Sequence, residues 1–117
     1  MDPKPSQITQ AQKNYIQNYM YNFESAMYNF NFEEVYQDYI DLPSWVDYFL
    51  VTEIGKHIDA YQLSFYIYKD KDSKGGKLHL GPLWNFNFGY GNFDFACSPD
   101  PSGWAYEFPY CGSYHPF

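Results

Sequence analysis

The stretch YQLSFYIYKDKDSKGGKLHL, residues 61–80, is where the spacing of apolar residues changes along the chain. Residues 63–68 alternate between apolar side chains and serine or tyrosine, which is the two-residue period of a β-strand. The charged, glycine-containing run at 69–77 predicts a solvated turn, and residues 78–83 predict the returning strand. The stretch therefore predicts an antiparallel β-hairpin.

Two segments before the hairpin have helical spacing instead. Thr9 and Gln12 form a capping box at the start of a helix that should end near Asn29. A second helix should begin at Asp41 and end at Gly55. The apolar positions expected to be buried are Ile16, Tyr19, Met20, Phe23, Met27 and Phe30 in the first helix, and Trp45, Val46, Phe49, Leu50 and Ile54 in the second.

The remaining sequence completes an α+β fold class. Beyond Phe88 the chain is rich in glycine, proline and aromatic residues and has no periodicity, which predicts irregular structure. At 117 residues the chain is one domain at most. Aromatic residues make up 24% of it, which is enough to build a core and is not typical of a disordered segment. We expect two N-terminal helices, a β-hairpin and an irregular C-terminal segment.

The charge of the chain excludes some partners. The formal net charge is −7, so the chain lacks the basic stripe that a nucleic-acid partner requires. Four of its seven Lys and Arg residues fall in the predicted turn at 69–77. The sequence also has no run of 18 apolar residues and no visible signal peptide, so we expect no membrane span.

Two cysteines leave the redox compartment open. Cys97 and Cys111 could form a disulfide in a secreted protein or remain two free thiols in a cytosolic one. Together with His115 they supply only three candidate metal ligands without a familiar spacing, so we do not expect a metal site there.

Two short motifs carry the chemistry. His57-Ile-Asp59 follows the second predicted helix, and Asn85-Phe-Asn87 follows the hairpin. In protein kinases an Asp in the catalytic loop accepts the substrate hydroxyl proton, and a hairpin later an Asp followed by Phe holds magnesium. The spacing by itself is weakly specific, because His-x-Asp is a common tripeptide. A structural interpretation is also open, in which Asp59 caps its loop and the asparagines satisfy their own backbone.

Longer motifs make the kinase interpretation more specific. The chain resembles the CotH kinase family, the spore-coat-protein-H-like proteins, in the form found in Bacteroidetes-type bacteria. The most specific motifs are Asp59-Ala-Tyr-Gln-Leu-Ser and Gly81-Pro-Leu-Trp-Asn-Phe-Asn. Further similarity lies in Lys4-Pro, Tyr15-Ile-Gln-Asn-Tyr, the hairpin turn, Gly91-Asn-Phe-Asp and Gly103-Trp-Ala-Tyr, so that the resemblance covers nearly the whole chain.

The resemblance implies a divergent protein-kinase-like fold in a secreted or surface-associated protein. Family members transfer phosphate from ATP, with a divalent metal such as Mg²⁺, to serine residues of partner proteins. Asp59 matches the catalytic-loop carboxylate, and Asn85 falls where the family usually has its metal-binding Asp, with Asn87 also facing the nucleotide phosphates. Ser64 stands where a kinase catalytic loop has a second metal-binding Asn, and Asp94 matches an acidic residue common in these relatives.

Two features depart from the kinase pattern. Asn85 has a carbonyl oxygen without the charge of a carboxylate, and Ser64 supplies only a hydroxyl, which predicts weak magnesium binding. No glycine-rich loop and no lone lysine on a strand precede the first helix. We therefore expect residues 1–117 to be a partial kinase domain, the catalytic-loop and metal-loop half, inactive by itself.

Two functions from different classes stay open. The first is a serine kinase whose parent protein phosphorylates coat or surface proteins. The second is a pseudokinase-like binding or scaffold module without catalysis, and the response to Asn85→Asp discriminates between them. Exposed aromatic side chains also suggest self-association and, less specifically, carbohydrate binding.

Overall fold

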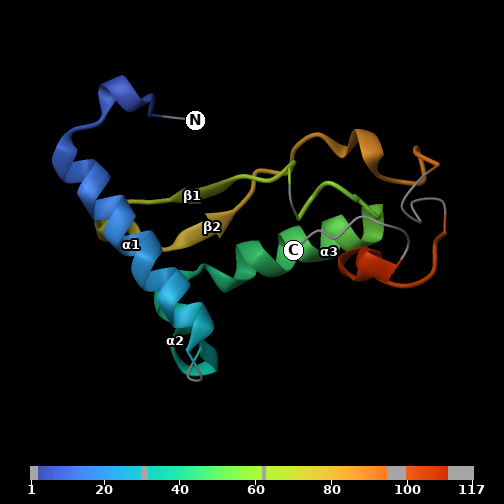
Figure 1. Ribbon diagram of the computed structural model, residues 1–117, viewed down its shortest axis with the longest axis horizontal. Helices are drawn as coiled ribbons and strands as arrows, with labels where there is room; N and C mark the ends of the chain where they lie inside the picture. Colours follow the sequence, from blue (N-terminus) through green and yellow to red (C-terminus); the bar gives the residue numbers. More distant parts are fainter. Residues whose placement is uncertain (1–2, 30–31, 62, 95–99, 111–117) are drawn as a thin grey trace. The chain divides into compact units, whose positions relative to one another are not determined.

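The computed structural model describes residues 3–29, 32–61, 63–94 and 100–110 (Figure 1). The chain divides into two compact units, residues 1–39 and residues 40–117. The helices are α1 (Gln10–Tyr28), α2 (Phe32–Tyr39) and α3 (Leu42–Gly55), the strands are β1 (Ile67–Lys69) and β2 (Leu78–Leu80), and the 3₁₀ turns are η1 (Pro5–Gln7), η2 (Asp72–Lys74), η3 (Phe86–Phe88) and η4 (Ala105–Tyr110). The predicted α+β class is confirmed, but the described residues form three α-helices where the sequence predicts two.

Helix α1 begins where the sequence predicts. The Gln12 backbone N–H donates to Thr9 Oγ1 at 3.2 Å, and the Thr9 N–H donates to Gln12 Oε1 at 2.8 Å. This reciprocal pair satisfies two N–H groups that have no partner within the helix. The helix ends at Tyr28, and Asn29 is its C-cap, as expected.

The buried side of α1 is narrower than predicted. Phe23 and Ala26 are buried, whereas Ile16 and Met27 are 38% and 49% exposed. The predicted apolar stripe is therefore only partly confirmed, and Phe30 lies outside the described residues.

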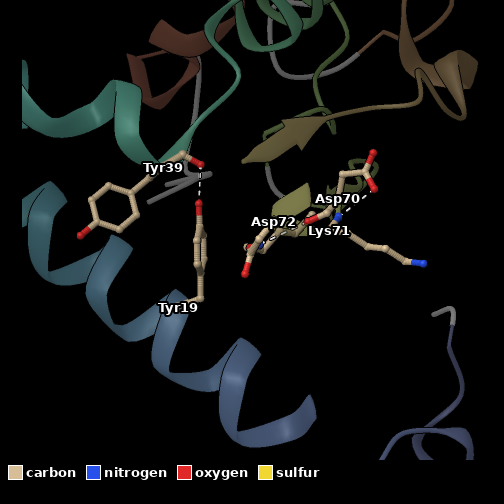
Figure 2. Close-up of polar contacts among 6 residues, drawn as sticks. Tyr19, Tyr39, Asp70, Lys71 and Asp72 are labelled. Carbon is tan, nitrogen blue, oxygen red and sulfur yellow. Dashed lines mark hydrogen bonds and ion pairs between the residues drawn. The ribbon is translucent and has the colours of Figure 1, made fainter. Parts of the chain in front are cut away.

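Helix α2 is an element that the sequence pattern does not indicate. Glu33 and Glu34 lie in its first turn, where negative charge is favourable. The Tyr19 hydroxyl of α1 donates to the Tyr39 carbonyl oxygen at 2.9 Å (Figure 2). The rings of Phe23 and Tyr39 lie 5.9 Å apart. A helix of this length is not stable alone in water, so packing against α1 is what allows α2 to form.

Helix α3 opens the second unit, and both of its ends agree with the prediction. The Asp41 carboxylate accepts a hydrogen bond from the Ser44 N–H at 3.1 Å. Gly55 is the last helical residue, and Lys56 then takes the left-handed conformation, with a φ of 44°, that ends the helix.

The buried face of α3 is not the one that the sequence predicts. Val46, Leu50 and Ile54 are 44%, 48% and 77% exposed, so the prediction that they are buried is wrong. The buried side chains of this helix include Tyr48 and Glu53 instead. The reason is that irregular segments pack on this face, and their backbone N–H and carbonyl groups require polar partners.

The hairpin is confirmed, but it is shorter than predicted. β1 and β2 are antiparallel, with Ile67 opposite Leu80. Residues 63 and 64, predicted as strand, belong to a turn instead, because their N–H groups donate to the Asp59 carbonyl and not to a second strand.

Strand β2 lies beside the first half of α3 (Figure 1). The Leu78 carbonyl accepts hydrogen bonds from the Asp41 N–H at 2.8 Å and from Trp45 Nε1 at 3.1 Å. The Leu80 N–H donates to Ser44 Oγ at 3.3 Å. These bonds satisfy backbone groups of a strand that has β1 on its other edge, and they fix the hairpin against the helix.

The turn between the strands is charged, as predicted. Lys69 Nζ lies 2.9 Å from Asp72 Oδ1, and the Lys71 N–H donates to Asp70 Oδ1 at 2.8 Å (Figure 2). Gly76 has a φ of 64°, and a Cβ atom there would lie 2.7 Å from Asp72 Oδ1. A larger residue at this position would therefore disrupt the turn.

Candidate functional site

The predicted catalytic carboxylate, Asp59, lies in a compact turn that begins on the last turn of α3. The His57 N–H donates to the Thr52 carbonyl oxygen at 3.1 Å. The Ser64 N–H donates to the Asp59 carbonyl oxygen at 3.0 Å, which closes the turn. These bonds fix the Asp59 backbone, and its side chain is half-buried.

A buried tyrosine hydroxyl attaches this turn to α3. The Tyr48 hydroxyl donates toward the carbonyl oxygens of Ala60, at 3.0 Å, and of Ser64, at 3.2 Å. Burial raises the pKa of Tyr48 above its ordinary value, so the hydroxyl keeps its proton and remains a donor. Tyr48 is therefore a positioning residue for the Asp59 turn.

We expect Tyr48→Phe to lower the free energy of unfolding by about 1–2 kcal/mol, because two buried carbonyl groups lose their donor while the ring stays packed. Thermal unfolding followed by circular dichroism measures this change. Tyr68→Phe is the matched control, because Tyr68 is 52% exposed on β1. Equal losses in the two variants would show that the Tyr48 hydroxyl does not hold the turn.

The structure brings two of the predicted ligands together. Asn85 Nδ2 lies 3.5 Å from Ser64 Oγ, at the outer limit of a hydrogen bond, although the hairpin separates the two residues in sequence. Asn85 has a φ of 55°, in the left-handed region that Asn and Asp tolerate better than other non-glycine residues. The side chain of Asn85 thus extends from a conformationally restricted position toward the turn of Asp59.

A buried histidine makes a second link between the two loops. The His57 imidazole is fully buried, and its ring centre lies 4.6 Å from that of Phe86, the residue after Asn85. Burial lowers the pKa of His57, and the Asp59 carboxylate and the Trp84 carbonyl offset only part of this shift. The ring is therefore neutral at pH 7 and packs as an aromatic group.

The nitrogens of this ring are an unusual feature of the core. Among the described residues, neither His57 Nδ1 nor Nε2 has a partner at full hydrogen-bond geometry, although the Trp84 backbone lies close enough to raise the pKa of the ring in part. A buried polar atom without a partner destabilises the fold.

The segment after η3 is held on the end of α3. The Tyr90 N–H donates to the Gly55 carbonyl oxygen at 2.5 Å. A Cβ atom at Gly89 would lie 3.0 Å from the same oxygen, so this close approach favours glycine. The loop that carries Asn85 is therefore held at two places. Phe86 packs on His57, and Tyr90 is hydrogen-bonded to the end of α3.

The two other predicted site residues do not join this cluster. Asn87 is exposed, and its carbonyl oxygen accepts a hydrogen bond from Asn92 Nδ2 at 3.0 Å. Asp94 is exposed, and among the described contacts none joins it to Ser64 or Asn85. Their predicted roles toward phosphate and metal stay predictions.

The cluster is a weak donor set for a divalent cation. Among the described residues no group of three or more His, Cys, Asp or Glu side chains is placed to hold a metal. The paired groups of Asn85 and Ser64 are neutral, whereas Mg²⁺ in proteins usually has one or two carboxylate ligands. These residues do not fit a tightly held Mg²⁺ by themselves. Cys97, Cys111 and His115 lie outside the described residues.

The sequence reasoning missed a buried glutamate that connects the Asp59 turn to the C-terminal segment. Glu53 is 8% exposed, and its carboxylate accepts hydrogen bonds from the Ala105 N–H at 2.5 Å and the Tyr106 N–H at 3.2 Å. The same carboxylate accepts a hydrogen bond from the Tyr61 hydroxyl, two residues after Asp59.

Lys56 is a second buried charge that sequence reasoning missed. Its ammonium group donates to the carbonyl oxygens of Asp100, at 2.7 Å, and Ser102. Together, Glu53 and Lys56 hold residues 100–106 against the end of α3. The indication in the sequence was a Glu and a Lys three residues apart, at the end of an otherwise apolar helix.

A helix, an Asp-containing turn, a hairpin and an Asn-Phe loop follow one another here in the order of a kinase's catalytic and metal-binding loops. The family model described as CotH kinase protein matches residues 1–109. The chain belongs to this family, which confirms the resemblance seen in the sequence. Neither the curated proteins nor the solved structures gave a match. The kinase-like fold itself stays a prediction.

Within the described residues, none of the helices is both long enough and apolar enough to cross a bilayer.

Proposed function

We propose that this chain supplies the hydroxyl-orienting and phosphate-facing part of an ATP-dependent protein serine kinase. The observation that carries the proposal is the approach of the Asn85 amide to Ser64, in the turn that presents Asp59. Membership of the CotH kinase family supports it. The acceptors would be serine residues of partner proteins at the cell surface or outside the cell, as the family resemblance implies.

The chemistry follows from the residues present. Asp59 accepts the proton of the serine hydroxyl, and the serine oxygen attacks the γ-phosphorus of ATP. The bond to the β–γ bridging oxygen breaks, and ADP leaves. Mg²⁺ that arrives bound to ATP would neutralise part of the phosphate charge, since Asn85 and Ser64 do not hold the ion by themselves. Asn85 faces the phosphates with its amide. Tyr48 and His57 hold the Asp59 turn and the Asn85 loop in their positions.

A second function is favoured by one detail of the same contact. The amide nitrogen of Asn85 is directed at the Ser64 hydroxyl at 3.5 Å, so these two groups face each other and not a cation. This arrangement suits a pseudokinase-like binding or scaffold module, in which the loops keep their positions but no phosphate is transferred.

The two functions are separated by a labelling experiment. The open reading frame that contains this sequence is expressed and incubated with isotopically labelled ATP, Mg²⁺ and a serine-rich acceptor protein. If the chain is a kinase, we expect labelled serine, with a loss of about 100-fold in Asp59→Asn because general-base catalysis contributes at least that factor. Asp47→Asn, an exposed carboxylate on α3, is the matched control and should keep its rate.

Each other outcome has a defined meaning. Labelling that is unaffected by Asp59→Asn would contradict the role of Asp59. Labelling that is absent in the natural sequence and appears with Asn85→Asp would support the scaffold function. Absence of labelling in both proteins would count against phosphotransfer by this site.

A further inference from the structure

A groove opens on the second unit beside the end of α3. Its volume is about 710 Å³, within the range of ligand-binding pockets. Its lining comes from three segments: Leu50, Glu53, Ile54, Gly55 and Lys56 of α3 and its C-cap, then Tyr90 and Gly91, and then Pro101, Gly103 and Trp104. The candidate phosphotransfer residues Asp59, Ser64 and Asn85 are not among them, so the groove is a separate feature of the unit.

Large apolar side chains remain exposed in this groove. Leu50 and Ile54 are 48% and 77% exposed, and Tyr90 and Trp104 are 70% and 51% exposed. Val46 extends the same helix face by one turn, because residues four apart lie on one side of a helix. Exposed apolar side chains gathered in a concave site indicate a binding surface more strongly than single exposed residues do.

The walls of the groove are fixed before any partner arrives. Lys56 and Glu53 hold residues 100–106 through buried charged groups. The Trp104 ring stacks on Phe49, with 6.2 Å between ring centres. The Tyr90 backbone is bonded to the Gly55 carbonyl. A partner that enters such a preformed groove loses little affinity to ordering of the protein.

The charges near the groove indicate the kind of partner that it would bind. In residues 40–60 and 90–110, the described acidic side chains are Asp41, Asp47, Glu53, Asp59, Asp94, Asp100 and Glu107. Lys56 is the only Lys or Arg in these two ranges, and its ammonium group is buried against two carbonyl oxygens. The other lysines of this unit lie in the hairpin turn at 69–77. The groove is thus apolar and aromatic inside. The exposed carboxylates beside it are those of Asp100, whose neighbour Pro101 lines the groove, and of Glu107, whose Oε2 would lie 3.9 Å from a Cβ atom at Gly103.

We propose that this groove binds a segment of a partner protein in which apolar side chains alternate with Lys or Arg. The apolar side chains would cover Leu50 and Ile54. The cations would lie over the exposed rings of Tyr90 and Trp104 and near the exposed carboxylates of Asp100 and Glu107. This interaction does not depend on phosphotransfer, so the two proposals can fail independently.

Binding of a synthetic peptide tests the proposal. The probe is a short fluorescent peptide of Leu, Trp and Arg, and its binding to the full chain is followed by anisotropy. Ile54→Lys removes apolar surface from the groove and adds a repelling charge, so we expect its affinity for the peptide to fall by about tenfold or more. Leu63→Lys is the matched control, since Leu63 is 71% exposed outside the groove and the change in net charge is the same. We expect it to alter affinity by less than about threefold.

Three further measurements make the result decisive. Ile54→Gln should also weaken binding, which separates the loss of apolar contact from charge repulsion, and thermal unfolding checks that each variant folds. A polylysine peptide should bind far more weakly than the probe. Equal losses in Ile54→Lys and Leu63→Lys, or equal affinity for polylysine, would overturn the proposal. So would self-association of the chain that Ile54→Lys abolishes, with no peptide binding, because the occupant would then be a second copy.

Discussion

Replacing Asn85 with aspartate is expected to raise the affinity of the chain for Mg²⁺ or Mn²⁺ by about tenfold or more, because affinity for hard cations rises with the number of charged oxygen ligands. The natural pair of Asn85 and Ser64 brings two neutral groups within 3.5 Å of each other. Aspartate at this position would add a full negative charge beside Ser64, which lies in the turn that also carries Asp59.

The fold should accept this substitution. Aspartate has nearly the shape of asparagine and also tolerates the left-handed conformation that residue 85 adopts. The contact with Ser64 can persist with its direction reversed, because the serine hydroxyl can donate to a carboxylate. Ala at the same position would lose both the contact and the tolerance of a positive φ, so Asn85→Ala tests stability more than binding.

Isothermal titration with Mn²⁺ measures the effect. Asn87→Asp is the matched control, since it adds the same charge two residues away on an exposed side chain that no described contact joins to Ser64. We expect it to change affinity by less than about threefold. If the two variants bind Mn²⁺ equally, the gain reflects net charge alone, and the Asn85–Ser64 pair is not a metal position.

Local signals in the sequence were sufficient to predict where two helices begin. Thr9 with Gln12, and Asp41 before Ser44, satisfy backbone groups within one turn, so the chemistry of the cap is complete in a few residues. The faces of α3 could not be predicted in the same way. The apolar pattern placed Ile54 inside, but the segments that pack on this helix present backbone polar groups, and Glu53 is buried to satisfy them.

The candidate site, too, could be predicted only in part from the sequence. The resemblance to CotH kinases pointed to Asp59, Ser64 and Asn85. The structure brings Ser64 and Asn85 together, and the catalytic role of Asp59 stays a prediction. The residues that hold the loops in place were not found. Tyr48 acts through carbonyl groups, and any backbone carbonyl accepts a hydrogen bond regardless of the residue type, so the sequence carries no trace of such a contact. The packing of His57 on Phe86 depends likewise on the hairpin that brings the two loops together.

Replacing Glu53 with glutamine is expected to lower the free energy of unfolding by about 2–3 kcal/mol, which is a large part of the stability of a small domain. The two carboxylate oxygens accept hydrogen bonds from the Ala105 and Tyr106 N–H groups and from the Tyr61 hydroxyl. Glutamine replaces one of these oxygens with an NH₂ group. A buried donor would then face another donor, and the charge-assisted character of the remaining bonds would be lost.

Thermal unfolding of Glu53→Gln, with Glu107→Gln as the exposed control, measures this loss, and equal melting temperatures would contradict it.

The pH dependence of stability gives a second test of the hydrogen bonds around Glu53. Burial and the hydrogen bond to Glu53 raise the pKa of Tyr61 above its ordinary value of 10.0. The unfolded chain therefore ionises this tyrosine first, and stability that is complete below pH 10 falls as the pH rises above it, by up to about 1.4 kcal/mol per pH unit. Tyr61→Phe removes the titrating group and should flatten this alkaline slope, whereas an unchanged slope would show that Tyr61 does not keep its proton against Glu53.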